Sequence, residues 1–276
     1  MNMNLDQISQ LLSHYPNLFD SKDFSIEPLG NGLIHETWKI STSKKQVVLQ
    51  AYNQSVFPYP ERIQNNLGIL YQNQVADRLP FELPLPLPNQ NGQQLTEFLG
   101  KRWRIFPFVS GRTLEQIQTS NQAWLAARAF GEFSAAGGHL SMESFQETIP
   151  NFHRLDIRFE RFQEVASAAN TLEKEERELL NFYLNQKPLI ESYKNQRHQL
   201  PLRLTHSDTK INNLIFSEDL QQINALIDLD TVMPGLLLYD FGDLVRTVAC
   251  SIPEIGTKWD EIRLQEGIFE QLMLGY

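Results

Sequence analysis

HSDTKINNLIF at residues 206–216 and NALIDLD at residues 224–230 are the stretches that decide the fold of this chain. Within them, Asn213 follows Asp208 by five positions, and Asp228 follows it by twenty. Each stretch joins a polar segment to a short run rich in Leu, Ile and Phe, which is typical of a strand. The sequence therefore predicts a hairpin whose polar ends carry these three side chains.

This combination of side chains suits phosphoryl transfer. That reaction asks for little covalent work from the protein. It needs a carboxylate near the attacking hydroxyl and hard oxygen ligands for the magnesium that bridges the phosphates. Asp208, Asn213 and Asp228 supply these groups, and His206 precedes the first by two positions. The plain alternative is that Asp208 and Asp228 only cap turns.

The pattern His-x-Asp-x4-Asn, followed by Ile-Asp, resembles the aminoglycoside phosphotransferase and choline kinase superfamily. NGLIHETWKI (31–40), VVLQAYN (47–53), ETIPNFH (147–153) and the segment 225–246 are similar to its N-acetylhexosamine 1-kinase branch. The resemblance implies an α+β, two-lobed protein-kinase-like fold, with an antiparallel-sheet N-lobe and a mainly helical C-lobe.

The same resemblance implies a set of roles. Asp208 is expected to be the catalytic base, and Asn213 and Asp228 the magnesium ligands. Asp230 is expected either to bind the metal directly or to contact one of the residues that bind it. The expected cofactors are ATP and Mg²⁺.

The change of pattern along the chain divides it near residue 110. Extended signals precede that point and helical spacing follows it. We expect a nucleotide-binding lobe over 1–105, a hinge over 106–110 and a helical lobe with the catalytic loop over 111–276. The expected strands are 33–41, 46–52, 94–99 and 103–109, and apolar stripes around Phe130 and Phe162 are expected to form core.

Three segments are candidates for nucleotide binding. Gly30-Asn31-Gly32 could let the backbone approach phosphates. The same three residues are also typical of an ordinary glycine turn without a ligand. Backbone groups around Phe106 and Phe108 would meet the adenine edge. Gln50 stands where kinase-like folds usually carry the lysine that holds the phosphates.

For the acceptor, His35 and Lys210 are candidate binding residues beside Asp208. Lys210 could equally stabilise charge on the transferred phosphoryl group. The resemblance implies phosphorylation of the anomeric hydroxyl of an N-acetylhexosamine. Two alternatives stay open: another small acceptor (an aminoglycoside, choline or ethanolamine, or a homoserine-like compound), and a non-catalytic nucleotide-binding protein.

Two nearby residues are assigned structural roles. Asp240-Phe241-Gly242 spells the magnesium-binding tripeptide of protein kinases, but it stands 32 positions after Asp208 instead of about twenty. Asp240 is therefore expected to cap a helix that begins near Phe241. His206 is expected to be a buried brace.

Composition excludes several classes of protein. Net charge of −9 without a basic run argues against nucleic-acid binding. The single cysteine, Cys250, fits a reducing compartment, and no apolar run approaches the length of about 20 residues that a membrane helix needs. We expect a cytoplasmic protein without membrane contact, whose oligomeric state stays open. The apolar helical pattern at 271–276 suggests a shortened C-lobe.

Overall fold

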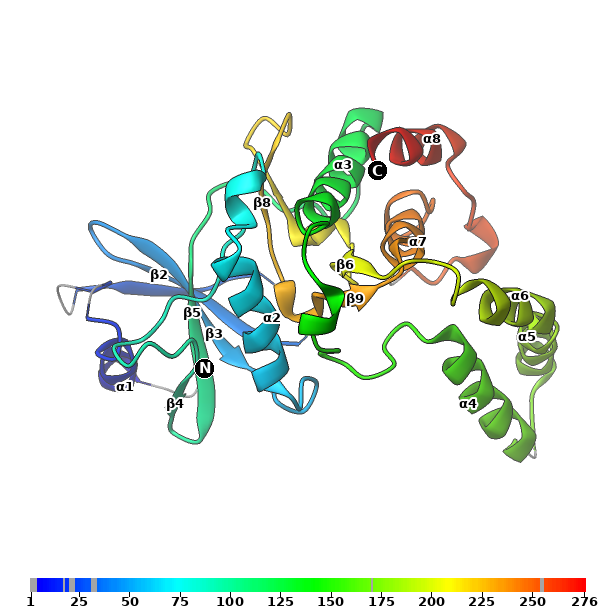
Figure 1. Cartoon of the computed structure of the whole chain (residues 1–276), viewed down its shortest axis with the longest axis horizontal. Helices are drawn as coiled ribbons and strands as arrows, with labels where there is room; N and C mark the ends of the chain where they lie inside the picture. Colours follow the sequence, from blue (N-terminus) through cyan, green and yellow to red (C-terminus); the bar gives the residue numbers. More distant parts are fainter. Residues whose placement is uncertain (1–3, 17, 20–22, 31–33, 170, 254–255) are drawn as a thin grey trace.

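The computed structural model describes residues 4–16, 18–19, 23–30, 34–169, 171–253 and 256–276 (Figure 1). A five-stranded antiparallel sheet in the order β1-β2-β3-β5-β4 forms one end of the molecule, and helices dominate the rest. The predicted α+β class is confirmed. The strands of this sheet are β1 Ser25–Pro28, β2 Glu36–Ser41, β3 Gln46–Tyr52, β4 Thr96–Phe98 and β5 Lys101–Pro107.

The two faces of the sheet are distinct because side chains alternate along each strand. On β3, Val47, Leu49 and Ala51 are buried, and they pack in one cluster with Leu11 of helix α1, Leu5–Leu12. Gln50 takes the other face, where the register sets it directly opposite Arg104 of β5. That second face is the one turned toward the rest of the chain.

Besides α1, the part of the chain that the structure describes forms seven α-helices. They are α2 Pro60–Gln72, α3 Ser120–Ala136, α4 Leu155–Ala168, α5 Lys174–Leu184, α6 Lys187–Gln196, α7 Leu237–Val248 and α8 Glu266–Gly275. The predicted core face of α3 is confirmed, since Ala127, Phe130 and Phe133 are fully buried. The apolar pattern at the end of the chain forms α8, which packs on α3.

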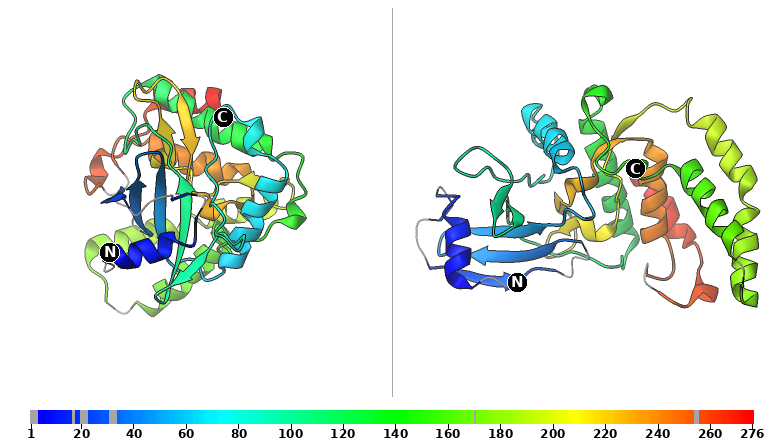
Figure 2. Two further views of the ribbon diagram at one scale, coloured as in Figure 1. Left: turned by 90° about the vertical axis from the view of Figure 1, so that its left-hand side faces the viewer. Right: turned by 90° about the horizontal axis from the view of Figure 1, so that it is seen from below.

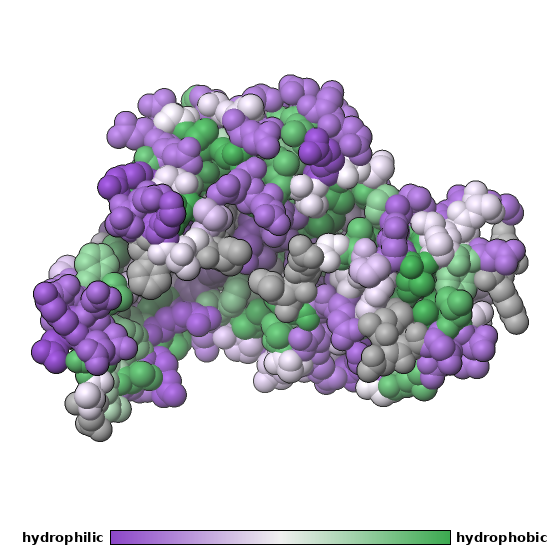
Figure 3. All heavy atoms as spheres, turned by 180° about the vertical axis from the view of Figure 1, so that it is seen from behind, coloured by the Kyte–Doolittle hydropathy of each residue, from purple (hydrophilic) through white to green (hydrophobic). Residues whose placement is uncertain are grey.

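Helices α4, α5 and α6 form an arm that stands off from the body (Figures 1 and 2). The predicted burial of the second apolar stripe is wrong here: Phe162 is half-buried and Val165 is 59% exposed. Helix α4 packs on α6, and the described residues place no further layer over its outer side. Seen from behind in Figure 3, the arm lies at the left, with apolar side chains exposed among polar ones.

Two small antiparallel sheets carry the polar loops. β6 Arg203–Thr205 pairs with β9 Met233–Gly235, and β7 Leu214–Phe216 pairs with β8 Ile223–Leu226. The predicted hairpin is therefore confirmed as β7–β8. Asp208 lies in the connection from β6 to β7, and Asp228 lies in the connection from β8 to β9.

The hydrophobic core is in two parts. One lies between the large sheet and α1. The larger part joins residues of α2 and the following segment, such as Leu67 and Phe81, to α3 and α7. The segment 57–83 thus packs with the helical body, and the boundaries 1–105, 106–110 and 111–276 stay a prediction. Within the described residues, no helix is both long and apolar enough to cross a membrane.

Gly111, just after the expected hinge, is a position that only glycine fits. Its φ is +140°, and a Cβ added there would lie 2.1 Å from the Phe216 carbonyl oxygen. We expect Gly111→Ala to lower the free energy of unfolding by about 2–4 kcal/mol, from overpacking and backbone strain together. Urea unfolding measures it. Gly92→Ala is the control, because Gly92 also has positive φ but open space around it; equal losses at the two sites would contradict the prediction.

Candidate active site

The loops that carry Asp208 and Asp228 are joined to each other by hydrogen bonds. The N–H of Ile227 donates to the Asn213 carbonyl at 2.9 Å. His206 Nε2 lies 3.0 Å from the Ile227 carbonyl oxygen, and its ring is fully buried against Phe130. The expected role of His206 as a buried brace is confirmed. These bonds hold the two predicted site loops side by side.

Both loops contain a strained residue. Ser207 has φ +64° and Asp228 has φ +60°, a region that side chains other than glycine seldom adopt. The Ser207 peptide is held on two sides: its N–H donates to Asp240 Oδ1 at 2.8 Å, and its carbonyl oxygen lies 2.8 Å from His153 Nε2. Strain maintained by surrounding bonds is typical of functional loops.

The side chain of Asp208 is oriented by Asn213. The Asn213 amide nitrogen donates to the Asp208 carbonyl at 2.8 Å and to Asp208 Oδ2 at 3.0 Å. This leaves the amide oxygen of Asn213 available as an acceptor. Lys210 Nζ lies 3.6 Å from Asp208 Oδ1, and both side chains are partly exposed. Asp208 can therefore meet a ligand from solvent.

Asp228 keeps contact with solvent but is crowded by protein atoms and by two other carboxylates. This crowding, followed by the negative charges of Asp230 and Asp208, raises its pKa to about 6. A cation bound there would relieve this repulsion.

The donor set fits magnesium only in part. No three His, Cys, Asp or Glu side chains of the described residues form a metal-binding group. Hard oxygen ligands are nevertheless present in the Asn213 amide and the Asp228 carboxylate. Magnesium commonly takes few protein ligands and completes its shell with phosphates and water, so these two residues fit it.

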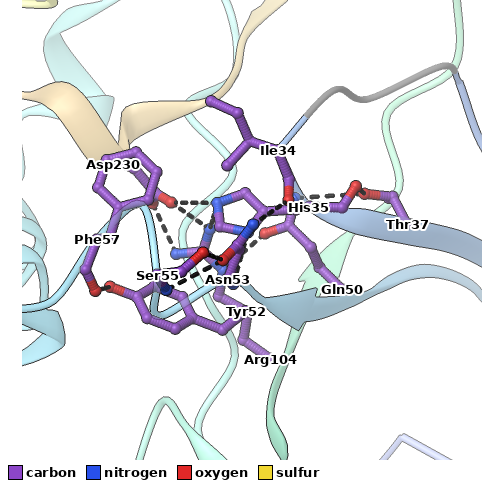
Figure 4. Close-up of polar contacts among 10 residues, drawn as sticks. All are labelled: Ile34, His35, Thr37, Gln50, Tyr52, Asn53, Ser55, Phe57, Arg104 and Asp230. Carbon is purple, nitrogen blue, oxygen red and sulfur yellow. Dashed lines mark hydrogen bonds and ion pairs between the residues drawn. The ribbon is translucent and has the colours of Figure 1, made fainter.

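Asp230 is committed to the protein instead (Figure 4). Its two oxygens receive the Arg104 guanidinium at 2.6 and 2.5 Å, and Oδ2 also lies 2.9 Å from His35 Nε2. Although burial alone would raise the pKa of Asp230, the Arg104 guanidinium holds it well below the usual range. This geometry does not fit the expected direct contact of Asp230 with a metal.

His35 is likewise engaged at both ring nitrogens. Its Nδ1 accepts the N–H of Asn53 at 3.0 Å, and the residue is only 6% exposed. Since Nδ1 accepts, Nε2 carries the proton and donates to Asp230. His35 was expected to bind the substrate that accepts the phosphoryl group. This arrangement does not fit that role, because both ring nitrogens are already hydrogen-bonded within the protein.

Gln50, at the expected lysine position, is hydrogen-bonded to Arg104. Arg104 was not among the site residues predicted from the sequence. Arg104 Nε donates to Gln50 Oε1 at 2.7 Å, and Gln50 Nε2 donates to Thr37 Oγ1 at 3.4 Å. Alternation along the predicted strand 103–109 could show which face Arg104 takes, but not that the register sets it opposite Gln50. No feature of the sequence pointed to its partner Asp230.

The remaining candidates for nucleotide contact are only partly described. Gly30 has φ +70°, which suits a tight turn, while Asn31 and Gly32 lie outside the described residues. Phe106 and Phe108 are half-buried at the end of β5. Their rings are covered by cations, Arg104 at 5.0 Å and Lys39 at 4.6 Å from the ring centres.

Asp240 has a different structural role from the one expected. Helix α7 begins at Leu237 with Leu236 as its N-cap, so the predicted cap at Asp240 is wrong. The carboxylate instead accepts the N–H groups of His206 and Ser207, each at 2.8 Å. The sequence could not show this because the contact spans more than thirty residues. Asp240 fixes the loop that carries Asp208.

Asp240 also makes stability depend on pH. Burial raises its pKa to about 6, although the nearby His206 and the two N–H groups oppose the shift. The folded state therefore holds this proton more tightly than the unfolded state. The bound proton therefore stabilises the folded state by at most about 3 kcal/mol. This stabilisation is fully present below about pH 4 and is lost as the pH rises through about 6. We therefore expect the free energy of unfolding of wild type, taken relative to that of Asp240→Asn, to fall by up to that amount between pH 4 and pH 6.5. Urea unfolding of both proteins measures it, and a relative value that does not change with pH would contradict the prediction.

Comparison with known proteins agrees with this arrangement. A profile described as the phosphotransferase enzyme family, APH, matches residues 25–269, which is most of the chain. The chain belongs to this family. A curated relative, homoserine kinase of Agrobacterium fabrum, is 26% identical over 225 residues. The match covers 78% of this chain and 62% of that kinase, so the chain spans less than two thirds of its relative.

Solved structures of phosphotransferases share the fold. Spectinomycin phosphotransferase, in complex with ADP and spectinomycin, has a TM-score of 0.62 at 14% identity, covering all of this chain and 80% of that one. A GDP complex of an aminoglycoside 2′-phosphotransferase scores 0.63 at 15% identity, covering 99% and 83%. Plasmodium vivax ethanolamine kinase scores 0.58 at 18% identity, covering 95% and 69%. At these identities the likeness shows the fold alone, and it confirms the predicted kinase-like architecture.

Proposed function

We propose that this chain is an ATP-dependent phosphotransferase that phosphorylates a hydroxyl group of a small molecule. The single observation that carries the proposal is the joining of the loop of Asp208 and Asn213 to the loop of Asp228, through the bond from the Ile227 N–H to the Asn213 carbonyl. Asp208 is the base, and Asn213 and Asp228 are the magnesium ligands. Family membership supports this, and so do the relatives named above, which include a homoserine kinase and an ethanolamine kinase.

Each residue has a defined task in this reaction. Asp208 accepts the hydroxyl proton as the acceptor oxygen attacks the γ-phosphorus of ATP, and ADP leaves as the bond between that phosphorus and the bridging oxygen breaks. Asn213 keeps that carboxylate oriented through its amide nitrogen, and its amide oxygen would be a ligand for magnesium. Magnesium, when bound, supplies charge that neutralises the phosphates. Lys210, 3.6 Å from Asp208, either binds the acceptor or stabilises charge on the phosphoryl group.

The nucleotide is proposed to lie between the sheet and these loops. Gly30, Asn31 and Gly32 would cover the phosphates, and backbone groups near Phe106 and Phe108 would meet the base. Gln50 offers a hydrogen-bonding amide without charge, and its oxygen is already taken by Arg104. The phosphates would therefore depend more on backbone N–H groups and on magnesium than in a kinase with a lysine at this place.

For the acceptor we propose the anomeric hydroxyl of an N-acetylhexosamine. The support is the resemblance of segments 31–40, 147–153 and 225–246 to the N-acetylhexosamine 1-kinase branch. The last of these contains both Asp228 and Asp240, and the second ends at His153, which contacts the loop of Asp208. Homoserine, ethanolamine and aminoglycosides are the competing acceptors, because kinases named for them are similar to this chain in sequence or in fold.

An acceptor panel tests the proposal. The protein is incubated with magnesium-ATP and each of N-acetylglucosamine, N-acetylgalactosamine, homoserine, ethanolamine and kanamycin, and ADP release and phosphorylated product are measured. Turnover with an N-acetylhexosamine supports the specific proposal; turnover only with another acceptor supports the kinase but replaces the substrate. Tight nucleotide binding without turnover of any acceptor, unchanged by Asp208→Asn, would favour the non-catalytic alternative.

A further inference from the structure

Arg104, Asp230 and His35 form a buried polar cluster that the proposed reaction does not use directly. Arg104 is 3% exposed and Asp230 is 2% exposed. At that depth neither charge is stable without its partner, because an unpaired buried ion is strongly disfavoured. The two oxygens of Asp230 match the two terminal nitrogens of Arg104, the most specific geometry for such a pair. The pair therefore has a fixed orientation.

The cluster connects the two parts of the proposed site (Figure 4). Arg104 lies on β5, directly opposite Gln50 on the sheet face that turns toward the helical body. Asp230 lies in the short turn Leu229–Thr231, two residues after Asp228. One ion pair thus spans from the nucleotide side of the sheet to the loop of the proposed metal ligand.

The surroundings restrict movement of the arginine. Its guanidinium lies between the rings of Tyr52, at 5.3 Å, and Phe106, at 5.0 Å. Its Nε is fixed by Gln50. On the other side of Asp230, His35 stacks on Tyr52 and is held by the Asn53 backbone. Every donor around Asp230 therefore has a second anchor on the sheet or on the segment after β3.

We propose that Arg104 is a positioning residue, which through Asp230 holds the loop of Asp228 against the nucleotide-binding sheet. Arg104 is not placed to touch the nucleotide or the acceptor, because it is buried and its three nitrogens already donate hydrogen bonds to Gln50 and Asp230. This inference rests on the proposed function, since it assigns Asp228 to magnesium.

A double-mutant cycle separates this role from two independent ones. Arg104→Met, Asp230→Asn and the double variant are compared with wild type for MgADP binding by calorimetry. If the pair acts as a unit, each single change weakens MgADP binding by about tenfold to a hundredfold, and the double variant is no weaker than the worse single one. If Asp230 binds metal and Arg104 binds phosphate separately, the losses multiply, and this outcome overturns the proposal.

Arg102→Met is the matched control. Arg102 lies on the same strand, but its partner is the exposed Glu97 at 3.2 Å. MgADP binding should change by less than about twofold, as is usual for surface pairs. Should Arg104→Met fail to fold, Arg104→Lys replaces it: this variant keeps the charge but loses the two-pronged geometry, and it should still bind MgADP at least about fivefold more weakly.

Hydrogen exchange without nucleotide distinguishes failure of this inference from failure of the proposed function. Amides of residues 226–233 should exchange faster in Arg104→Met than in wild type or Arg102→Met. If wild type binds no MgADP but this difference appears, the kinase proposal fails while the link between sheet and loop stands. If wild type binds MgADP and exchange in this loop does not change, the positioning role is wrong.

Discussion

Asp208→Asn should abolish most of the phosphotransferase activity while leaving nucleotide binding almost intact. The amide has nearly the shape of the carboxylate, so the contacts with Asn213 can largely persist. It cannot accept the acceptor proton, however, and loss of a general base costs about 10²–10⁴ in rate. We expect kcat to fall by at least that lower factor with the best acceptor of the panel, measured by ADP release.

The control for this prediction is Asp219→Asn. Asp219 is an exposed carboxylate in the turn between β7 and β8, bonded to Ser217. It shares the hairpin with the site but lies at the other end of the strands, so activity should be unchanged within about twofold, as for most surface changes. MgADP affinity, measured by calorimetry, should be the same for all three proteins within about threefold. An Asp208→Asn protein that retains a tenth of wild-type activity would remove Asp208 from the role of base.

Asp228→Asn should produce a comparable loss of activity through a different step. The substitution removes one negative charge from the proposed metal site and leaves only neutral amide oxygens there. Because magnesium binds carboxylate oxygen more strongly than amide oxygen, the magnesium concentration for half-maximal activity should rise by about tenfold or more. At saturating magnesium kcat should still be reduced by about 10²-fold or more, since the phosphates are no longer held correctly.

Titration of activity with magnesium, and then with manganese, measures this effect. The same titration on Asp208→Asn should give an unchanged metal requirement at a much lower rate. The two variants therefore separate the base from the metal ligand within one assay. If Asp228→Asn leaves the metal requirement unaltered, Asp228 is not a ligand, and the proposed arrangement of the site would have to be abandoned.

The elements that were correctly predicted are those in which local pattern and packing agree. β3 has the predicted bounds of 46–52, and the β7–β8 hairpin and the buried face of α3 were also expected. In each, alternating or helical spacing of apolar residues corresponds to a side that is covered in the fold. The stripe around Phe162 had the same spacing, but it lies on the arm, where no second layer of the described chain covers it. Periodicity shows which face is apolar, not what covers that face.

The candidate site divides in the same way. Asp208, Asn213 and Asp228 could be selected from spacing because all three lie in the loops that flank one hairpin: Asp208 and Asn213 before β7, and Asp228 after β8. Arg104 could not, since its importance depends on Asp230, which is 126 residues away. Asp240 was misassigned for a similar reason: its position suggested a helix cap, while its carboxylate reaches back to the N–H groups of His206 and Ser207.

The amino-acid sequence by itself determined the family, the order of sheet and helices, and the hairpin that carries the proposed base and metal ligands. All of these depend on side chains close together along the chain. Only the tertiary structure decided the partners of Asp230, His35 and Asp240. The physical reason is that a buried charge must find its partner in three dimensions, and the strand register and lobe packing that bring Arg104 to Asp230 leave no local pattern in the sequence.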